Sequence, residues 1–512
     1  MKKLLSLVLV LCLALGLCAM SAQADAAQVQ LTYWAPVNSA LTSVISSLDD
    51  NLCMQLLQES TGIDLVFQHP AVGQEREQFN LLIASRDLPD IIEYDWTSYA
   101  GGVQKAVDDG VIIPLNDYME EYAPNYSKFF VDYPAIAKQV KTDDGTICVF
   151  ASLSISEYNC QGGFIARQDW LDELGVESFR TIDEWEEVML KLIDEKDLEC
   201  GIALNFNNLR DRMIGAWNIS SGYFVDNGVV KYGPMEPEFA DFIATMARWY
   251  DNGILDPDFA ASDTTTLDSY MLEGETAMTY GFAGGTLGGL YTSAEAKGMT
   301  DFCPKGVPYP TVTGEPSYFT NVSWEYRGSQ SAAVTTQCED IKSAFTVLDY
   351  FFSDEGRLAK SFGKEGVSFT FVDGEPIYTD EVTHNADGLS MQQVLAKYTR
   401  AAYPCVGMIE TGYHEQYFVR PVQKESVKIW NEYKDLAYEK MMPRVSMTTE
   451  EASELATMNS LINDYRDEMM VKFIMGQESL DNLSKFTEQL KNLGVERAIE
   501  IYQAAYDRYQ AR

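Results

Sequence analysis

The stretch LIASRDLPDIIEYDW, residues 82–96, joins the end of an amphipathic segment to a short apolar run. The helical spacing of Phe79, Leu82 and Ile83 predicts a helix over residues 74–85, and PDIIEY predicts the strand that follows it. A tyrosine, an aspartate and a tryptophan come directly after that strand. Large side chains with polar edges at the end of a buried strand suggest that something lies beyond it.

Two strand–helix units precede this stretch. VQLTYWAP (29–36) and IDLVFQHP (63–70) have the composition of strands, and leucines at helical spacing separate them. A β-α-β-α-β order predicts parallel strands with right-handed crossovers, and ligands of such sheets lie beyond the carboxyl ends of the strands. The alternative is that these are loop residues whose tryptophans pack on neighbouring helices. The residues concerned are Trp34, Asn38, Tyr94, Asp95 and Trp96.

Composition and charge restrict the class of protein. Of 512 residues, 46% are hydrophobic and 12% aromatic, which indicates a globular chain with a large core. The 77 acidic and 38 basic residues give a net charge of −39. This charge disfavours nucleic acid and anionic lipid as partners, since both attract basic surfaces. A small ligand remains compatible with it.

The N-terminus has the pattern of an export signal. Lys2 and Lys3 precede an apolar run that ends near Met20, and Ala22 and Ala24 form the small-residue cleavage pattern. The run is shorter than the ~20 residues of a membrane span. We therefore predict a signal peptide over residues 1–24 and an extracellular or periplasmic location. A lipid anchor at Cys18 is disfavoured, because the preceding residue is a leucine rather than a small one.

Cysteines, histidines and acidic clusters predict no metal and no cofactor. Seven of the nine cysteines remain after signal removal, scattered and without a C-x-x-C pair, so we expect buried thiols rather than disulfides or zinc ligands. The acidic residues near 194–199 lack the alternating spacing of a calcium loop. His69, His384 and His414 lie far apart, and no H-E-x-x-H or G-x-S-x-G motif occurs. An enzymatic function is therefore disfavoured.

Several segments, in order, resemble one protein family. They are LTYWAP (31–36), GQEREQFNLLIASRDLPDIIEY (73–94), GVIIPLNDYMEEYAPN (110–125), KTDDGTICVF (141–150), ARQDWLDELGV (166–176), TIDEWEEV (181–188), LEGETAMTYG (272–281), AFTVLDYFFSDEGRL (344–358), FGKEGVSFTFVDGEP (362–376) and NLGVERAIEIYQAAYDRYQ (492–510). Together they cover nearly the whole mature chain. The chain resembles an extracellular solute-binding protein of a bacterial carbohydrate ABC transporter, of the LplA-like type.

The resemblance implies an α/β architecture, the two-lobed periplasmic-binding-protein type II fold, with a helix-flanked central sheet in each lobe and extra C-terminal helices. The N-terminal lobe would comprise residues 25–153 and 287–333, and the C-terminal lobe residues 154–286 and 334–512. A crossing between lobes is expected in the glycine run at 280–289, because glycine supplies backbone freedom.

A sugar site needs aromatic faces for the C–H surfaces and polar groups for the hydroxyls, since a buried unpaired hydroxyl costs ~1–3 kcal/mol. Stretches that combine both kinds of residue are the candidates. Beyond the five residues named above, the predicted ligand contacts are Tyr158, Gln161, Trp217, Tyr280, Phe282, Trp324, Glu325 and Arg327. Four other tryptophans lie in amphipathic segments and are expected in cores: Trp170, Trp185, Trp249 and Trp430.

The predicted function is capture of a carbohydrate, an oligosaccharide by preference, in a cleft between the lobes, for delivery to the membrane permease subunits of an ABC importer. The protein is expected to act as a monomer. Two alternatives stay open: a binding protein for a peptide or polyamine, and a secreted carbohydrate-active enzyme. Arg167 and Arg327 would suit a uronate, or would pair with local acids.

Overall fold

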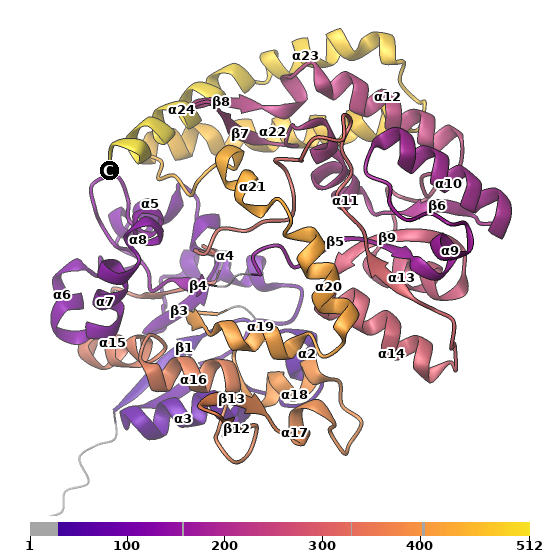
Figure 1. The fold of residues 1–512 in the computed structure, drawn as a ribbon. Coiled ribbons are helices and arrows are strands. Elements are labelled where there is room, and N and C mark those ends of the chain that lie inside the picture. The colour runs from indigo at the N-terminus through magenta and orange to yellow at the C-terminus, as the bar shows by residue number, and fades with distance from the viewer. Residues whose placement is uncertain (1–28, 156–157, 329, 402–404) are drawn as a thin grey trace, which may run out of the picture.

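A computed structural model describes residues 29–155, 158–328, 330–401 and 405–512. The predicted signal peptide and Cys18 lie outside these residues. Two lobes, each built on its own four-stranded sheet, lie side by side, and the longest helices cover the second lobe (Figure 1). Within the described residues, no helix combines the length and apolar character that crossing a membrane requires.

The sheet of the first lobe has the predicted parallel core. β1 (Gln30–Trp34) pairs in parallel with β2 (Asp64–Gln68) and with β3 (Ile91–Tyr94), and β11 (Ser331–Val334) pairs antiparallel with β3. The crossover helices α3 (Leu52–Thr61) and α4 (Glu75–Ser85) confirm the β-α-β-α-β prediction. Other helices of this part are α2 (Ser39–Thr42), α5 (Gly102–Asp108), α6 (Asn116–Tyr122), α7 (Pro124–Asp132) and α8 (Pro134–Val140).

The sheet of the second lobe is mixed. Its order is β10 (Pro304–Gly306), β5 (Gly162–Arg167), β9 (Thr276–Phe282) and β6 (Cys200–Ala203), with β6 and β9 parallel and the other pairs antiparallel. The surrounding elements are α9 (Gln168–Glu173), α10 (Ile182–Lys196), α11 (Phe206–Asp211), η3 (Met213–Trp217), the hairpin β7 (Tyr223–Asp226) and β8 (Val229–Tyr232), α12 (Glu238–Asp251), α13 (Thr264–Glu273) and α14 (Gly288–Ala296). Thr181 and Glu184 form a capping box at the start of α10.

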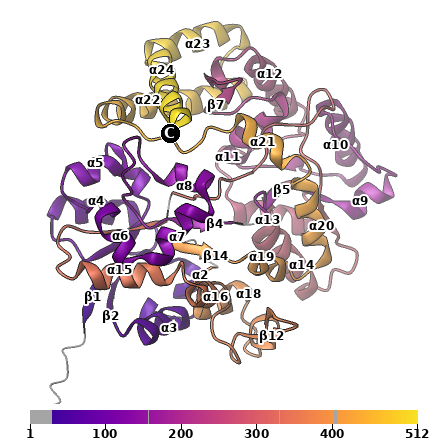
Figure 2. The same cartoon turned by 60° about the vertical axis from the view of Figure 1, so that its left-hand side comes forward.

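Long C-terminal helices cover the second lobe. α22 (Thr449–Ile474) packs on α12, α23 (Leu483–Asn492) follows it, and α24 (Val495–Ala511) lies against β8 and α22 (Figure 2). The end of α24 also reaches the first lobe, where Arg508 Nε donates to the carboxylate of Asp143 at 2.5 Å. These helices therefore contact both halves of the molecule.

An antiparallel ribbon connects the two lobes. Residues 150–155 and 158–160 run against residues 322–328 and 330–332 through bridges that join Phe150 to Ala332, Leu153 to Tyr326 and Cys160 to Val322. Its backbone hydrogen bonds include Ser154 N to Glu325 O at 2.9 Å and Arg327 N to Ser152 O at 3.0 Å. The same strand continues as β11 into the first sheet. β4 (Ser152–Ser154) also pairs in parallel with β14 (Gly407–Ile409).

The packing divides the chain differently from the predicted lobe boundaries. α15 (Ile341–Tyr350) and α16 (Asp354–Phe362) pack against α3 in the first core, although the prediction put residues 334–512 in the second lobe. Conversely, β10 joins the second sheet and α14 packs on α13, although residues 287–333 were predicted to belong to the first lobe. Within the glycine run, residues Ala283–Leu287 form a π-helical turn that leads directly into α14.

The remaining elements complete both halves. A small cluster beside α2 and α3 contains the hairpin β12 (Phe369–Val372) and β13 (Glu375–Tyr378) with α17 (Asp380–Thr383) and α18 (Met391–Tyr398). The chain then passes through α19 (Thr411–Tyr417) to α20 (Pro421–Trp430) and α21 (Lys434–Lys440). α20 contacts β10 and β5, which returns the chain to the second lobe.

A buried ion pair joins the first sheet to the segment before β14. Arg400 Nη2 donates to Glu93 Oε1 at 2.7 Å, and the Tyr33 hydroxyl donates to Glu93 Oε2 at 2.6 Å. All three side chains are almost fully buried. Removing one member of such a pair leaves the other charge in the interior without compensation, which is costly.

We expect Glu93→Gln to lower the free energy of unfolding of the first lobe by about 3 kcal/mol, because the guanidinium of Arg400 would lose its counter-charge. Urea unfolding followed by circular dichroism measures this change. Glu454→Gln is the matched control, since Glu454 pairs with Arg497 on the surface and its loss should leave the midpoint unchanged. Equal midpoints for both variants would contradict this prediction.

His414 is a second buried polar group. It lies in α19, only 5% exposed, and its Nδ1 has no hydrogen-bond partner among the residues that the structure describes. Burial and, secondarily, the positive charge of Arg327 lower the pKa of His414 to about 4. The imidazole is therefore neutral in the folded protein at neutral pH.

A histidine with a lowered pKa makes the unfolded chain the better proton acceptor below pH 6.5, so stability falls as the solution is acidified. Between pH 7.5 and pH 5, protonation of His414 in the unfolded chain should lower the free energy of unfolding of the wild type by about 2 kcal/mol. The variant His414→Gln should lack this contribution to the pH dependence. Urea unfolding curves at both pH values measure the free energy of unfolding of each protein. His384→Gln, at an exposed position, should retain the wild-type pH dependence.

Candidate functional site

The aromatic residues at the ends of the first-lobe strands belong to a core cluster. Trp96 is 1% exposed, and its Nε1 donates to the Ile92 carbonyl at 3.1 Å. Trp34 and the half-buried Tyr94 lie 5.6 Å apart, ring centre to ring centre, and both pack on Phe79. The prediction that Trp34 and Trp96 line a crevice needs correction, because the one-turn helix after β3 turns the Trp96 indole back into the lobe.

Two polar candidates nearby serve as helix caps. Asn38 Oδ1 accepts from Leu41 N at 2.9 Å and starts α2. Asp95 Oδ1 accepts from Thr97 N at 3.0 Å and starts the one-turn helix η2 (Trp96–Ser98). Both side chains therefore have a local structural role, which the sequence pattern did not reveal.

The second-lobe candidates divide between core and surface. Trp217 is 7% exposed and packs edge-on against Phe242, 5.2 Å between ring centres, so it too belongs to a core. Tyr280 is buried in β9, and its hydroxyl lies 3.4 Å from the hydroxyl of Tyr309. Phe282, at the carboxyl end of the same strand, is 52% exposed. Only Phe282 therefore offers an open aromatic face here.

The interlobe ribbon brings the remaining candidates together. Trp324, Glu325 and Arg327 are consecutive or nearly so on its second strand and are all half-buried. Tyr438 of α21 packs on Trp324 with 4.9 Å between ring centres, and Trp324 Nε1 donates to the Met442 carbonyl at 3.0 Å. These two rings form a fixed aromatic pair beside the ribbon.

Polar groups extend from this aromatic pair. Asn159 Nδ2 donates to the Tyr438 hydroxyl at 2.7 Å and approaches Glu325 Oε1 at 3.5 Å. The Tyr438 hydroxyl in turn donates to the Ser323 carbonyl at 3.2 Å. Burial and the charge of Glu325 raise the pKa of Tyr438, so its hydroxyl stays protonated. Aromatic faces, an amide and a carboxylate thus occur within one network.

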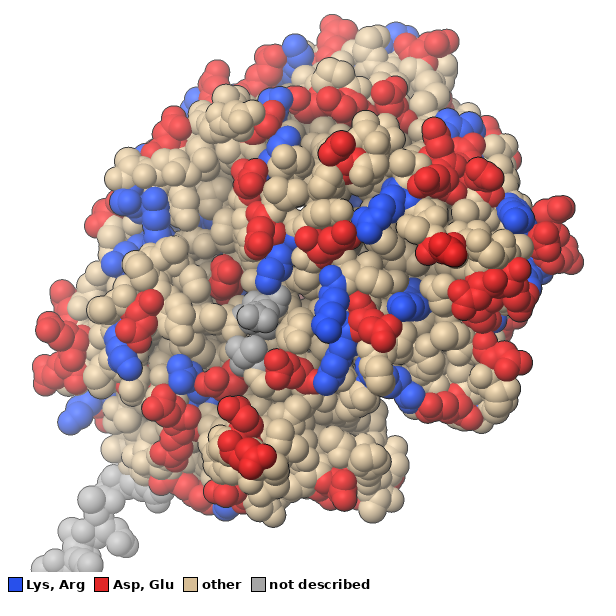
Figure 3. All heavy atoms as spheres, in the orientation of Figure 1, with Lys and Arg blue, Asp and Glu red and all other residues tan. Residues whose placement is uncertain are grey.

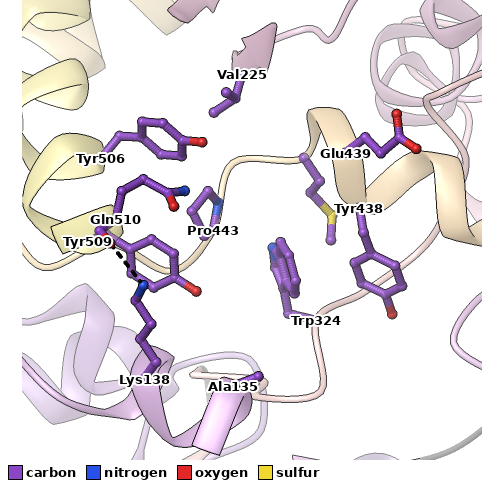
Figure 4. Close-up of a pocket in the computed structure, with 11 residues that line it drawn as sticks. Ala135, Lys138, Val225, Trp324, Tyr438, Glu439, Pro443, Tyr506, Tyr509 and Gln510 are labelled. Carbon is purple, nitrogen blue, oxygen red and sulfur yellow. Dashed lines mark hydrogen bonds between the residues drawn. The ribbon is translucent and has the colours of Figure 1, made fainter. Parts of the chain in front are cut away.

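A cavity of about 340 Å³ opens beside this network (Figure 4). Tyr506 and Tyr509 of α24 lie on one side, and Trp324 and Tyr438 lie on the other. Lys138 of α8 closes the bottom; its Nζ lies 4.6 Å from the centre of the Tyr509 ring and 3.4 Å from the Gln510 carbonyl oxygen. Because α8 belongs to the first lobe and α24 to the second, the cavity has walls from both.

Tyr158 and Gln161 lie at the second-lobe end of the ribbon. The ring of Tyr158 is half-buried and stands edge-on to Phe418, 6.0 Å away. The carbonyl of Gln161 accepts from Ala283 N at 2.9 Å, which ties the ribbon to the end of β9. Next to it, Gly162 leaves room for close approach, since a Cβ there would come within 3.1 Å of Phe282 and of the Tyr280 hydroxyl.

Arg327 is the charged group at the centre of the ribbon. Burial lowers the pKa of Arg327, with a smaller contribution from the charge of Arg444, while Tyr438 and Glu325 act in the opposite direction. By contrast, Arg167, the other arginine that the sequence suggested for a uronate, pairs with Asp169 and lies 3.7 Å from the Trp170 ring. Arg167 is therefore occupied by its own neighbours.

Sequence reasoning missed Asn159, Tyr438, Tyr506 and Tyr509. The two tyrosines of α24 are three residues apart on a helix that is amphipathic throughout, so their pattern is the same as that of core residues. Tyr438 lies in a short helix with similar spacing. A signal for their role exists only in three dimensions, where helices distant in sequence meet the ribbon.

The thiols and acidic residues form no metal site in the described part of the chain: no group of three or more His, Cys, Asp or Glu side chains there could hold an ion. The seven cysteines of the described residues are free thiols, buried except for Cys303.

Known proteins resemble this chain over different lengths. A polygalacturonan/rhamnogalacturonan-binding protein, YtcQ of Bacillus subtilis, is 25% identical over 43% of this chain and 44% of its own length. The fructooligosaccharide ABC transporter substrate-binding protein FusA of Streptococcus pneumoniae is 31% identical over 28% of each chain. The matched region thus spans less than half the length of either curated relative.

A solved structure shares the fold over nearly the whole chain. The alginate-binding protein AlgQ2, in a crystal structure without calcium ion, superposes with a TM-score of 0.77 and 22% identity, covering 94% of this chain and 98% of its own. This likeness confirms the predicted two-lobed α/β fold. The sequence profile for the bacterial extracellular solute-binding proteins matches residues 38–358, and the chain belongs to that family.

Proposed function

We propose that this protein captures an oligosaccharide at the interlobe ribbon and presents it to the membrane subunits of an ABC importer. The observation that carries the proposal is the pairing of Trp324 and Tyr438 next to Glu325, on a strand that connects the lobes. Sugar rings need flat apolar surfaces for their C–H faces and hydrogen-bonding groups for their hydroxyls. The cavity between α8 and α24 supplies both.

Because the proposed site lies between the lobes, ligand binding would change how the lobes are arranged. A ligand that contacts walls from both lobes favours the arrangement in which those walls are close, by the difference in its affinity for the two arrangements. Membrane subunits would then recognise the closed form. We propose that the protein works in this way as an exported monomer, without catalysing a reaction; the sugar-related names of its relatives support the choice of ligand.

The polyamine alternative fits the site less well than a saccharide. Arg327 on the ribbon and Lys138 at the base of the cavity would repel a polycation at close range. The overall negative charge, visible as acidic side chains spread over the surface in Figure 3, would attract polyamines only to the exterior. A peptide remains the second candidate, to be included in the same titration.

We expect Trp324→Ala to weaken oligosaccharide binding about tenfold, because the sugar would lose an aromatic face worth roughly 1–2 kcal/mol. Isothermal titration calorimetry with a panel of neutral and acidic oligosaccharides, short peptides and spermidine measures the affinities. Trp170→Phe is the matched control, since Trp170 lies beneath Arg167 in the second lobe, and it should bind like the wild type. Release of reducing ends over hours would point to an enzyme instead.

The outcome that would contradict the proposal is absence of heat from every saccharide, together with binding of a peptide or of spermidine. Equal affinity of wild type and Trp324→Ala for a saccharide would place the site elsewhere on the molecule. Both variants should be checked by thermal unfolding, so that loss of binding is not confused with loss of fold.

A further inference from the structure

The end of α24 forms a further contact between the lobes, apart from the ribbon (Figures 1 and 2). α24 packs in the core of the second lobe through Val495 and Ile501. α8 belongs to the core of the first lobe through Ala137 and Val140. The last turn of α24 nevertheless lies against the carboxyl end of α8. Polar groups that belong to two separate cores therefore meet there.

One carboxylate, that of Asp143, lies at the centre of this contact. It accepts from Arg508 Nε at 2.5 Å and pairs with Arg512 Nη2 at 2.8 Å. The three side chains are between 12% and 32% exposed, so salt screens their charges less than those of pairs on the open surface. Glu451 of α22 lies 2.5 Å from Nη2 of Arg508 and thereby holds this guanidinium in place beside Asp143.

The two helices also cap each other. Arg512 Nη1 donates to the Lys138 carbonyl at 3.0 Å and to the carbonyl of Lys141, which directly follows α8. In the opposite direction, Lys138 Nζ donates to the Gln510 carbonyl of α24 at 3.4 Å. The last carbonyls of a helix lack partners within it and carry the negative end of the helix dipole, so a cation stabilises them. Each of these cations comes from the other lobe.

These bonds hold together two walls of the cavity beside Trp324 (Figure 4). Lys138 lines the cavity from the first lobe, and Tyr506 and Tyr509 line it from the second. Lys138 Nζ lies 4.6 Å from the centre of the Tyr509 ring, so an attraction between a cation and an aromatic face crosses the same boundary. The lobes cannot separate at this cavity while Asp143 holds both arginines.

From this arrangement we propose that Asp143, Arg508 and Arg512 form an ionic clamp that keeps α8 and α24 together, and that its rupture opens the cavity between them. The role of the clamp in admitting an oligosaccharide rests on the proposed function and adds to it the element that controls access. Ligand contacts and ion pairs favour the same closed arrangement, so their free energies act in the same direction. Ionic strength changes the balance, because salt weakens the attraction between partly exposed charges.

Distances between two spin labels on the ligand-free protein test the clamp. The label sites are Val131→Cys of α7, which packs on α8, and Leu461→Cys of α22, which packs on α24; both positions are exposed. Cys303→Ser removes the exposed native thiol. Double electron–electron resonance measures the distance distribution. We expect a short distance to dominate in this labelled parent at low salt, and Asp143→Asn to raise the population with a longer distance about tenfold, because two charge-assisted hydrogen bonds lose their charged acceptor.

Further variants make the test independent of one substitution. Arg512→Gln should act like Asp143→Asn, and the double variant should open less than the two single effects together predict, because both remove the same ion pair. Arg497→Gln is the matched control: Arg497 lies on the same helix and pairs with Glu454 at the surface, so the distribution should stay that of the parent. Thermal unfolding identifies any variant that fails to fold, and the other variant then carries the test.

Salt gives a second measurement on the same labelled proteins. Raising it to about 1 M, where the Debye length is ~3 Å, should open the parent more than it opens Asp143→Asn. Equal salt responses, or one distance distribution shared by the parent, Asp143→Asn and Arg512→Gln, would overturn the inference. These measurements contain no saccharide. Failure of every saccharide to bind in calorimetry would overturn the proposed function and leave the measured distances as they are, so the two failures are distinguishable.

Discussion

The antiparallel ribbon, in which residues 150–155 and 158–160 pair with residues 322–328 and 330–332, is the constraint on which the rest of this structure depends. Backbone hydrogen bonds such as Ser154 N to Glu325 O hold the two segments together, and their pairing decides which side chains face the space between the lobes. One strand continues into β11 of the first sheet, and the other leads into β5 of the second. A shift by one residue would exchange the faces of Trp324 and Glu325. The same ribbon thus joins the lobes and carries residues of the proposed site.

Both signs of charge occur beside the ribbon of this acidic molecule. The chain carries −39 overall; Glu325 and Arg327 lie on the ribbon, and Lys138 and Glu439 line the cavity beside it. In Figure 3, Lys and Arg gather near the middle of the visible face, over α20, while Asp and Glu surround them.

The sequence predicted the first-lobe sheet well and its aromatic residues poorly, for the same physical reason. Strand and helix periodicity depends on which face of an element is buried, so the order of β1, β2 and β3 with their helices could be predicted. Periodicity does not say what covers a residue beyond the end of a strand. Trp96 follows β3 at the position where ligands usually lie, but a single helical turn folds it onto Phe79 and Tyr99. Trp217 meets Phe242 in the same manner.

Sequence alone determined that the chain is a two-lobed α/β protein of the solute-binding type. It also predicted that the stretch from Asn321 to Gly328 contacts ligand, because local composition there combines an aromatic residue with both signs of charge. Tertiary structure decided which helices complete that site and which half of the molecule each segment joins. Tyr438 and Tyr509 are more than a hundred residues from Trp324, and α15 returns to the first core after the chain has crossed from the second lobe. Contacts of this kind depend on the packing of whole elements, and no local pattern of residues encodes them.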